Sequence, residues 1–448
     1  MSALKFPRAL FEQDRGEKAS EPVQMPDCPT VSGSVANYLH GLRARLRQRH
    51  TLRAHAWQSL ANYAQQGFGL VFGIIMARIL TPADFGAFGF AAASVFLAML
   101  PAMWSLAPTL AARGGQTPAN YQAAAAFGWC VVFVRVAVAA LVCAVFVQRG
   151  QHQTAGLCLI MGIAESGREL NNVQRVYLEG QGNFKPNLIS ATIGIAFCLA
   201  VAVPLSFLGW GPFVLALPAL GGFVIDFFVY RHFSGRSVFV RPDWSLRTGF
   251  RIESFWLWLH ASAEVTLVRL DSWFVGKFLG EQTLGYYNRA FGYAPISHML
   301  LSSFVANPTV VGLGSCENAP ARRALLIRTA GVLFTGGFLN WIAFFFFAHP
   351  IVLFVFGPKW ESSVPLFQAY ASLSLAYTFG FLPAALMLSE RRYREIGIVR
   401  ICCVALFVCA LLVVPGTRSA VSVAWLVQAT WVLQGLLLLF RGRSILKE

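Results

Sequence analysis

A series of long apolar runs occupies almost the whole chain and constrains its fold more than any other feature. Each run has about 20 residues, the length at which a helix crosses the roughly 30 Å hydrocarbon layer of a bilayer. Only 12% of the residues are charged, whereas a soluble domain usually carries about 25%. The sequence therefore predicts an all-α integral membrane protein.

Twelve of these runs are expected to be transmembrane helices. Six lie in the first half, at residues 56–80, 86–112, 121–147, 154–178, 187–208 and 211–233. Six lie in the second half, at residues 250–276, 288–313, 324–348, 362–389, 395–414 and 420–440. This predicts an N-terminal lobe over 56–233, a linker over 234–249 and a C-terminal lobe over 250–440. The tails are 1–55 and 441–448, and every connection is too short for a soluble catalytic domain.

The basic residues predict the orientation of the chain. Lys and Arg exceed Asp and Glu by 36 to 20, an excess that in a soluble protein would indicate nucleic-acid binding but here decides sidedness. With the N-terminus inside, 27 of the 36 cations fall on inner segments. Because Lys and Arg concentrate on the cytoplasmic side, we expect a multi-pass cell (inner) membrane protein with both termini cytoplasmic. The tail over 1–55 is expected to be largely disordered, and its basic end either rests on anionic headgroups or only fixes the topology.

A short internal repeat predicts how the halves are related. RILTPADFGAF from Arg78 and KFLGEQTLGYY from Lys277 match at a constant offset of 199 residues, which pairs Gly86 with Gly285. In each copy a cation ends one span, a turn follows, and the glycine is expected to open the next span. Duplication predicts two six-helix lobes, related by a pseudo-two-fold axis along the membrane normal, around a central cavity.

Polar residues of the fourth span share one helix face, within an arc of about 120°. They are Glu165, Arg168, Glu169, Asn172 and Arg175. One interpretation is an internally neutralised seam, with ion pairs such as Glu165 with Arg168. The other is a cavity wall in which Arg168, Arg175 and also Arg135 contact the phosphates of a sugar-bearing substrate, with Asn172 nearby. Gln65 and Gln66 of the first span either line the same cavity or belong to a face that packs through glycines.

Acidic residues and one histidine form a second polar line, in the seventh span. His260, Glu264 and Asp271 lie on one face together with Glu253. Such a line suits proton or sodium coupling, as do Glu165 and Glu169, because intramembrane ionisable groups commonly form ion pathways. The alternative is that Asp271 is an interfacial helix end and His260 a hydrogen-bonded core residue. No ATP-binding or metal-binding motif is present, so a proton or sodium gradient is expected to be the energy source.

Three separated motifs resemble one known family. RILTPADFG contains Arg78, Pro82 and Gly86; GYYNR contains Gly285, Tyr287, Asn288 and Arg289; and the GPKW turn runs from Gly357 to Trp360. In order and spacing they resemble the polysaccharide transporter branch, the Wzx-type flippases, of the multidrug/oligosaccharidyl-lipid/polysaccharide exporter superfamily. The resemblance covers roughly residues 56–440.

The resemblance implies a transporter rather than an enzyme. Its substrate would be a polyprenyl-pyrophosphate-linked oligosaccharide, flipped to the outer leaflet by alternating access for exopolysaccharide, capsule or O-antigen (lipopolysaccharide) biosynthesis. Implied partners are membrane lipids, a polysaccharide polymerase and glycosyltransferases. Two alternatives remain: a multidrug-type cation exporter, against which the arginines of the fourth span argue, and an integral-membrane polysaccharide polymerase or ligase, against which the short outer connections argue.

Overall fold

A computed structural model describes residues 57, 59–103, 118–239, 248–296, 298–302, 305, 309, 313, 319–390, 392–413 and 419–443. Contacts divide the chain into residues 1–52 and 53–448, and the helices described below belong to the second unit. The tail predicted over 1–55 lies outside the described residues. So do residues 240–247 of the predicted linker and residues 444–448 of the predicted C-terminal tail.

The described part of the first half contains a helix over residues 59–79 and, after it, further helical segments. These are α2 (Pro82–Ala98), η2 (Leu100–Ala102), α4 (Pro118–Gln148), α5 (His152–Gly180), α6 (Lys185–Phe197), α7 (Val203–Phe207) and α8 (Phe213–Ser234). The π-helical turn η3 (Cys198–Ala202) joins α6 directly to α7, so the span predicted over 187–208 is one continuous element.

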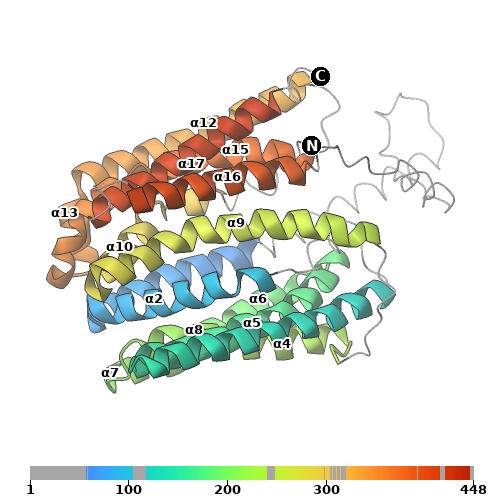
Figure 1. Ribbon diagram of the computed structural model, residues 1–448, viewed down its shortest axis with the longest axis horizontal. Helices are drawn as coiled ribbons and strands as arrows, with labels where there is room; N and C mark the ends of the chain where they lie inside the picture. The colour runs from blue at the N-terminus through green and yellow to red at the C-terminus, as the bar shows by residue number, and fades with distance from the viewer. Residues whose placement is uncertain are drawn as a thin grey trace, which may run out of the picture. The chain divides into compact units, whose positions relative to one another are not determined.

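The second half repeats this all-helical pattern. It contains α9 (Thr248–Leu279), α10 (Glu281–Tyr293), α12 (Ala319–Phe346), α13 (Ala348–Val355), η4 (Pro358–Ser363), α14 (Val364–Tyr370), α15 (Leu373–Ser389), α16 (Tyr393–Val413) and α17 (Ala420–Gly442). Figure 1 shows α2, α9 and α10 running side by side. The described residues contain no strand, which confirms the predicted all-α class.

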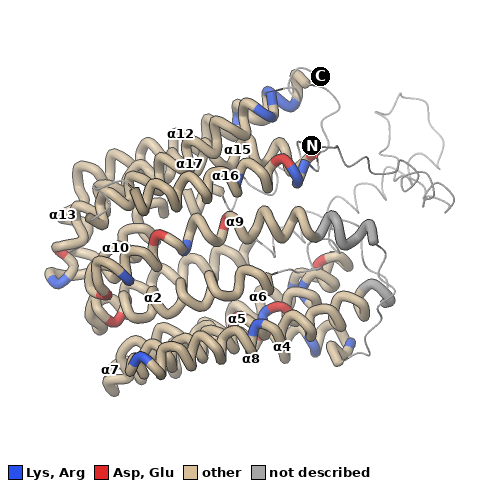
Figure 2. The backbone as a smooth tube through the Cα atoms, viewed as in Figure 1, with Lys and Arg blue, Asp and Glu red and all other residues tan. Residues whose placement is uncertain are grey.

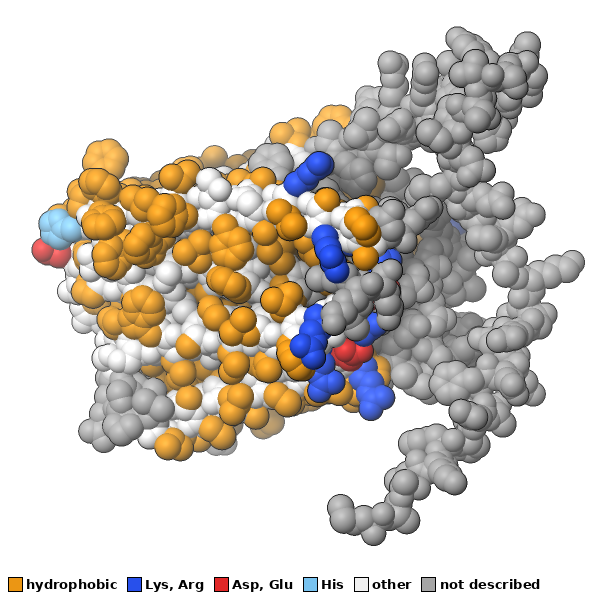
Figure 3. Space-filling view, turned by 90° about the horizontal axis from the view of Figure 1, so that it is seen from above, with side chains coloured by type: hydrophobic (Ala, Val, Ile, Leu, Met, Phe, Trp, Pro, Cys, Tyr) orange, Lys and Arg blue, Asp and Glu red, His pale blue; other side chains and the backbone are white. Residues whose placement is uncertain are grey.

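Six described helices are long and apolar enough to cross a membrane: α4, α6 with α7, α8, α12, α16 and α17. A seventh is the pair η4–α14 and α15, which is bent by 41°. Figure 3 shows a face covered by hydrophobic side chains, with Lys and Arg gathered towards one end. Helices α5 and α9 are equally long but carry charges within their length, as Figure 2 shows. The chain is therefore a multi-pass membrane protein.

The starts of α2 and α10 differ from the prediction. Thr81 caps α2: its side chain accepts a hydrogen bond from the backbone N–H of Asp84, and the Asp84 carboxylate accepts from the backbone N–H of Thr81. This capping box, with Pro82 at the first helical position, starts the helix four residues before Gly86. Gly280, with a φ of 92°, makes the corresponding turn before α10. The expectation that Gly86 and Gly285 open their spans is therefore wrong, because both lie inside helices.

The helix bundle has two ends, which we call the basal end and the distal end. Helices α5, α8, α15 and α17 end at the basal end, and α4, α9, α12 and α16 end at the distal end. The predicted orientation would place the basal end in the cytoplasm, and this sidedness stays a prediction, as do the exact lobe boundaries.

Candidate functional site

The repeated glycines build the contact between α2 and α10. A Cβ atom added to Gly86 would lie 1.7 Å from the carbonyl oxygen of Glu281, and one added to Gly285 would lie 1.8 Å from that of Pro82. The offset of 199 residues that relates Gly86 to Gly285 also relates Pro82 to Glu281. The two contacts are thus equivalent under the repeat, as an approximate two-fold axis between α2 and α10 requires. Only glycine allows two helix backbones to approach this closely.

Lys359 and Trp360 of η4 bind the end of the helix over residues 59–79. Together with Arg78 of that helix they form what we call the distal clasp. Lys359 Nζ donates to the carbonyl oxygens of Arg78 (2.9 Å) and Leu80 (2.5 Å), and Trp360 Nε1 donates to that of Ala77 (2.9 Å). In return, Arg78 Nε donates to the carbonyl oxygen of Val355 (2.9 Å). The last carbonyls of a helix have no partner within it, so these bonds satisfy them while tying the two halves together.

Residues of the three sequence motifs pack against one another around the Trp360 ring of the distal clasp. The Phe85 and Trp360 rings lie 5.4 Å apart, and the Tyr286 ring lies 5.9 Å from that of Trp360. The Arg289 guanidinium lies 3.6 Å from the centre of the Phe85 ring and 5.9 Å from that of Trp360. Gly357, with a φ of 96°, supplies the turn that delivers Trp360. The motifs identified by spacing are therefore parts of one interface between the halves.

An apolar cavity of about 630 Å³ lies next to this interface. Its polar lining consists of Gln65, Gln66, Arg168, Ser190, Asp226 and Arg289, with Tyr293. Arg289 NH1 donates to the Tyr293 hydroxyl (3.2 Å) and to the carbonyl oxygen of Gly73 (3.4 Å), and no carboxylate of the described chain pairs with it. The Arg289 guanidinium therefore lines a mainly apolar cavity and, among the described residues, has no carboxylate in direct contact.

A second, more polar cavity of about 770 Å³ adjoins the first, since the two share Gln65, Arg168 and Asp226. It is lined by the predicted residues Gln65, Arg135, Glu165, Arg168, Glu169, Asn172 and Arg175. Gln66 lines the first cavity, so all six predicted substrate-binding residues face one of the two spaces. Arg168 and Arg175 keep 45% and 44% of their side chains exposed. Their predicted contact with substrate stays a prediction.

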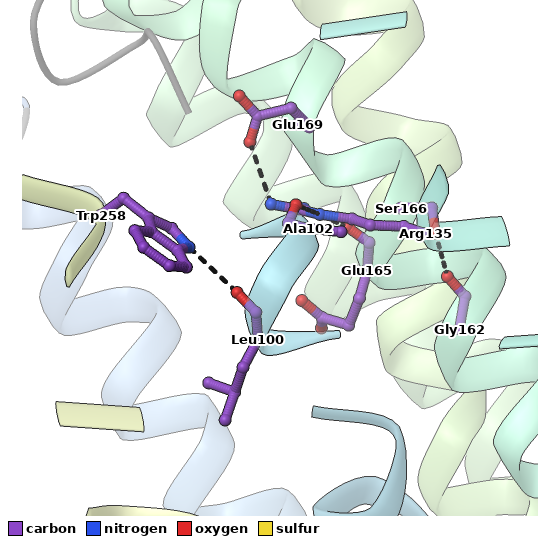
Figure 4. Close-up of polar contacts among 8 residues, drawn as sticks. All are labelled: Leu100, Ala102, Arg135, Gly162, Glu165, Ser166, Glu169 and Trp258. Carbon is purple, nitrogen blue, oxygen red and sulfur yellow. Dashed lines mark hydrogen bonds and ion pairs between the residues drawn. The ribbon is translucent and has the colours of Figure 1, made fainter. Parts of the chain in front are cut away.

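The Arg135 side chain binds other groups of the protein (Figure 4). Its Nε donates to the carbonyl oxygen of Ala102 (2.8 Å), and its NH2 lies 3.6 Å from Glu169 Oε2 in a pair whose side chains are 11% and 3% exposed. Trp258 of α9 donates to the carbonyl oxygen of Leu100 (3.0 Å). Both halves thus hold η2 where α2 ends, and Arg135 has few donors left for a substrate.

The polar stripe of α5 combines the two interpretations left open by the sequence. Arg168 NH1 donates to Glu165 Oε1 at 2.6 Å, the pair expected of a neutralised seam. Arg175 Nε lies 3.8 Å from Glu179, a carboxylate outside the predicted set. The same arginines nevertheless line a cavity, so internal pairing and a cavity wall coexist.

The acidic residues Glu264 and Asp271 of α9 bind two different neighbouring helices, α16 and α10. Glu264 Oε2 accepts a hydrogen bond from Arg400 NH1 of α16 (2.5 Å). Asp271 is fully buried and accepts hydrogen bonds from the Tyr287 hydroxyl (2.6 Å) and the backbone N–H of Ser272 (2.6 Å). Since α9 continues to Leu279, the interpretation of Asp271 as an interfacial helix end is wrong.

The remaining members of these sets are placed as follows. His260 Nδ1 is buried and has no hydrogen-bond partner in the described part of the chain, and the side chain of Glu253 lies outside it. The Asn288 amide oxygen accepts from Ser272 Oγ (3.0 Å), so neighbouring motif residues Tyr287 and Asn288 both bind α9. No group of three His, Cys, Asp or Glu side chains among the described residues could hold a metal ion.

Sequence reasoning missed three interior charges. Arg289 is predicted only as a motif residue and Arg400 not at all, yet Arg289 lines a cavity and Arg400 is 5% exposed inside α16. Asp226 of α8 lines both cavities and accepts a hydrogen bond from Ser190 of α6. Each lies in or beside a predicted span, and an intramembrane charge is by default a functional candidate.

Comparison with known proteins now adds a family and a fold. The profile of a family described as "Polysaccharide biosynthesis protein" matches residues 75–365, about two thirds of the chain. No curated protein sequence matches significantly.

Several solved structures are similar to the chain. The inward-facing conformation of a multidrug resistance MATE family transporter of the MOP superfamily gives a TM-score of 0.61 at 13% identity, over 87% of this chain and 98% of that one. The outward-facing conformation of such a transporter gives 0.62 at 14%, over 89% and 96%. A MATE structure in the straight conformation gives 0.60 at 14%, over 89% and 96%. The chain thus has the two-lobed all-α fold of these structures, which confirms the predicted fold class.

Proposed function

The chain belongs to the family of polysaccharide biosynthesis proteins, and we propose that it flips a polyprenyl-pyrophosphate-linked oligosaccharide across the cell membrane. The task is to carry a pyrophosphate and a glycan through hydrocarbon while the prenyl tail stays in lipid. Two adjoining cavities, one polar and one apolar, offer such a path. The product would serve assembly of exopolysaccharide, capsule or O-antigen, together with glycosyltransferases and a polymerase.

The observation that carries the proposal is the position of the arginines. Arg168 and Arg175 line the polar cavity with nearly half of each side chain exposed, and Arg289 lines the apolar one without a carboxylate partner in the described chain. Guanidinium groups bind phosphate oxygens bidentately and are less strongly hydrated than ammonium groups. A pyrophosphate moving from Arg175 past Arg168 to Arg289 would therefore meet a cation at each stage.

The same cavities disfavour a cation exporter. Their carboxylates are Glu165, Glu169 and Asp226, and each is engaged by Arg168, Arg135 or Ser190. A cationic drug would have to compete with these partners, whereas an anion meets Arg289 directly. The surplus of available charge in the path is positive, which suits a phosphate-bearing substrate.

Energy coupling is assigned to Asp271 of α9, with Tyr287 as its partner on α10. The Asp271 carboxyl has hydrogen-bond donors but no ion-pair partner among the described residues. Glu264, by contrast, is held by Arg400. A carboxyl of this kind, between α9 and α10, can exchange an ion when these two helices separate, so a proton or sodium gradient would drive the cycle.

The first test replaces the cavity arginines and measures both binding and export. Arg168→Gln and Arg289→Gln should each weaken binding of the lipid-linked oligosaccharide by about 10- to 100-fold, the range for loss of one hydrogen-bonded charge. Arg328→Gln, at an exposed arginine of α12, is the control. Export should be measured as surface polymer in a strain that lacks the chain, with membrane levels of each variant checked by blotting.

The proposal fails if both cavity variants bind and export as the control does. Arg168 is partly exposed, so its variant should fold even if loss of Arg289 disturbs the interface. For coupling, Asp271→Asn should bind substrate normally yet lose the dependence of transport on an ion gradient. Unchanged gradient dependence would reject the assignment of Asp271.

A further inference from the structure

A groove of about 460 Å³ lies at the distal end, outside the two cavities described above. Helix α2 packs against both α4 and α9, and residues of all three, with the first residue of α10, line the groove. Its wall includes Leu141 and Val145, which are 66% and 37% exposed on the outer surface of α4. In a membrane protein such a surface contacts lipid, so the groove opens towards hydrocarbon chains.

Two cations stand at its rim. Arg149 follows the end of α4, and Lys277 lies in the last turn of α9; both are exposed. No ion-pair partner of either side chain occurs within the described ranges, and the nearby Glu281 is the single carboxylate of the lining. The rim therefore carries a net positive charge, contributed by both halves of the chain.

The interior of the groove holds an unsatisfied hydroxyl. Ser94 is 8% exposed, lines the groove, and its Oγ has no hydrogen-bond partner among the described residues. A buried hydroxyl without a partner is unfavourable and gains from a polar acceptor. Ser94 lies one helical turn, about 6 Å, beyond Phe90, whose ring contacts that of Phe146 beside the rim (5.9 Å). A matching occupant needs an acceptor about one turn below its charged group.

We propose that this groove binds one anionic glycerophospholipid of the distal leaflet. Its phosphate lies between Arg149 and Lys277, an ester carbonyl accepts a hydrogen bond from Ser94 Oγ, and an acyl chain lies along Leu141 and Val145. A glycerophospholipid has an ester group below its phosphate, whereas a prenyl chain has no polar atom at that depth. The inference does not depend on the transported substrate.

Such a lipid would also couple to the conformation of the protein. Arg149 belongs to the first half and Lys277 to the second, so one headgroup bridges the seam between them. A ligand that contacts both sides of a seam favours the state in which both contacts form. The bound lipid therefore stabilises the distal arrangement seen here, in which the clasp is closed.

The test measures lipid binding to the delipidated full-length protein by native mass spectrometry. Phosphatidylglycerol, phosphatidylcholine, a polyprenyl phosphate and glycerol phosphate are added in turn. We expect one phosphatidylglycerol to bind, and the double variant Arg149→Gln/Lys277→Gln to bind it about 30-fold more weakly, the factor that two interfacial cations supply. Arg441→Gln, at an exposed cation at the end of α17, should bind as the wild type does.

Ser94→Ala separates a lipid contact from a structural role. The variant should bind phosphatidylglycerol several-fold more weakly while its melting temperature without lipid stays the same or rises, because an unpartnered hydroxyl is removed. Unchanged phosphatidylglycerol affinity in the double variant would overturn the site. Stronger binding of polyprenyl phosphate, or equal binding of glycerol phosphate, would overturn the assignment of a glycerophospholipid.

Discussion

Substitution of Gly86 by alanine tests the contact that the internal repeat creates. The added Cβ would lie 1.7 Å from the carbonyl oxygen of Glu281, and ordinary contact begins at 3.4 Å. Helices α2 and α10 would therefore have to separate by about 1.7 Å. The obstacle is a backbone atom, so no side chain can move aside to relieve it.

The expected cost follows from overpacking, which typically destabilises by about 1–3 kcal/mol. Alanine favours a helix interior over glycine by about 1 kcal/mol, so the net loss in the free energy of unfolding is about 0–2 kcal/mol, against a gain of about 1 kcal/mol at a glycine whose Cβ meets nothing. The overpacking applies only where α2 and α10 touch, as they do with the clasp closed, whereas the helix preference of alanine is the same in both states. The population of the closed state should therefore fall by about 5- to 150-fold relative to a state in which the helices part.

The assay combines thermal unfolding in detergent with labelling of one cysteine by a membrane-impermeant maleimide from the distal side. In a cysteine-free chain, a cysteine replacing Phe88, which lines the apolar cavity, reports distal opening. Gly285→Ala should behave like Gly86→Ala, since the two contacts are equivalent under the repeat. Gly331→Ala is the control, because its Cβ would meet nothing within 4 Å.

The reasoning is refuted if Gly86→Ala keeps the melting temperature and labelling rate of Gly331→Ala. It is also refuted if Gly86→Ala and Gly285→Ala have clearly different effects. Either result would mean that the two-fold-like contact does not govern the interface between the halves.

Two further predictions concern polar contacts, one within the first half and one between the halves. Arg135→Leu should lower the free energy of unfolding by about 3–5 kcal/mol, because it leaves Glu169 buried without its cation. Adding Glu169→Leu should restore most of the loss. A double variant that denatures as easily as the single one would contradict the structural role of the pair. Trp360→Phe should increase distal labelling, because the carbonyl oxygen of Ala77 loses its donor. Trp425→Phe, at a tryptophan that is 50% exposed on α17, should leave labelling unchanged, and equal effects of the two would reject the clasp.

The sequence predicts the long helices well because their boundaries follow from apolar length alone. The span expected over 211–233 is α8 (Phe213–Ser234), and that expected over 395–414 is α16 (Tyr393–Val413). The repeat likewise predicts two related halves. The start of α2 was misplaced because local chemistry, a capping box and a proline, extends the helix beyond its hydrophobic run.

The helix faces inferred from the sequence could not predict which residues far apart in the chain pair with each other. A face shows that Glu264 and Asp271 point the same way, but not that Arg400, 136 residues away, meets Glu264. Similarly, the GYYNR motif attracts attention to Arg289 without showing that its guanidinium lies over Phe85. Tertiary packing decides which charges are neutralised, and hence which remain available to a substrate.

Transport in proteoliposomes tests the central claim most directly. A polyprenyl-pyrophosphate-linked oligosaccharide, labelled on its glycan, is placed in one leaflet, and its arrival in the other is followed with an impermeant enzyme that cleaves the label. The account predicts movement with the wild-type chain and loss of most of that rate with Arg168→Gln. Absence of glycan movement by folded protein that binds the lipid, or an undiminished rate for Arg168→Gln, would contradict it.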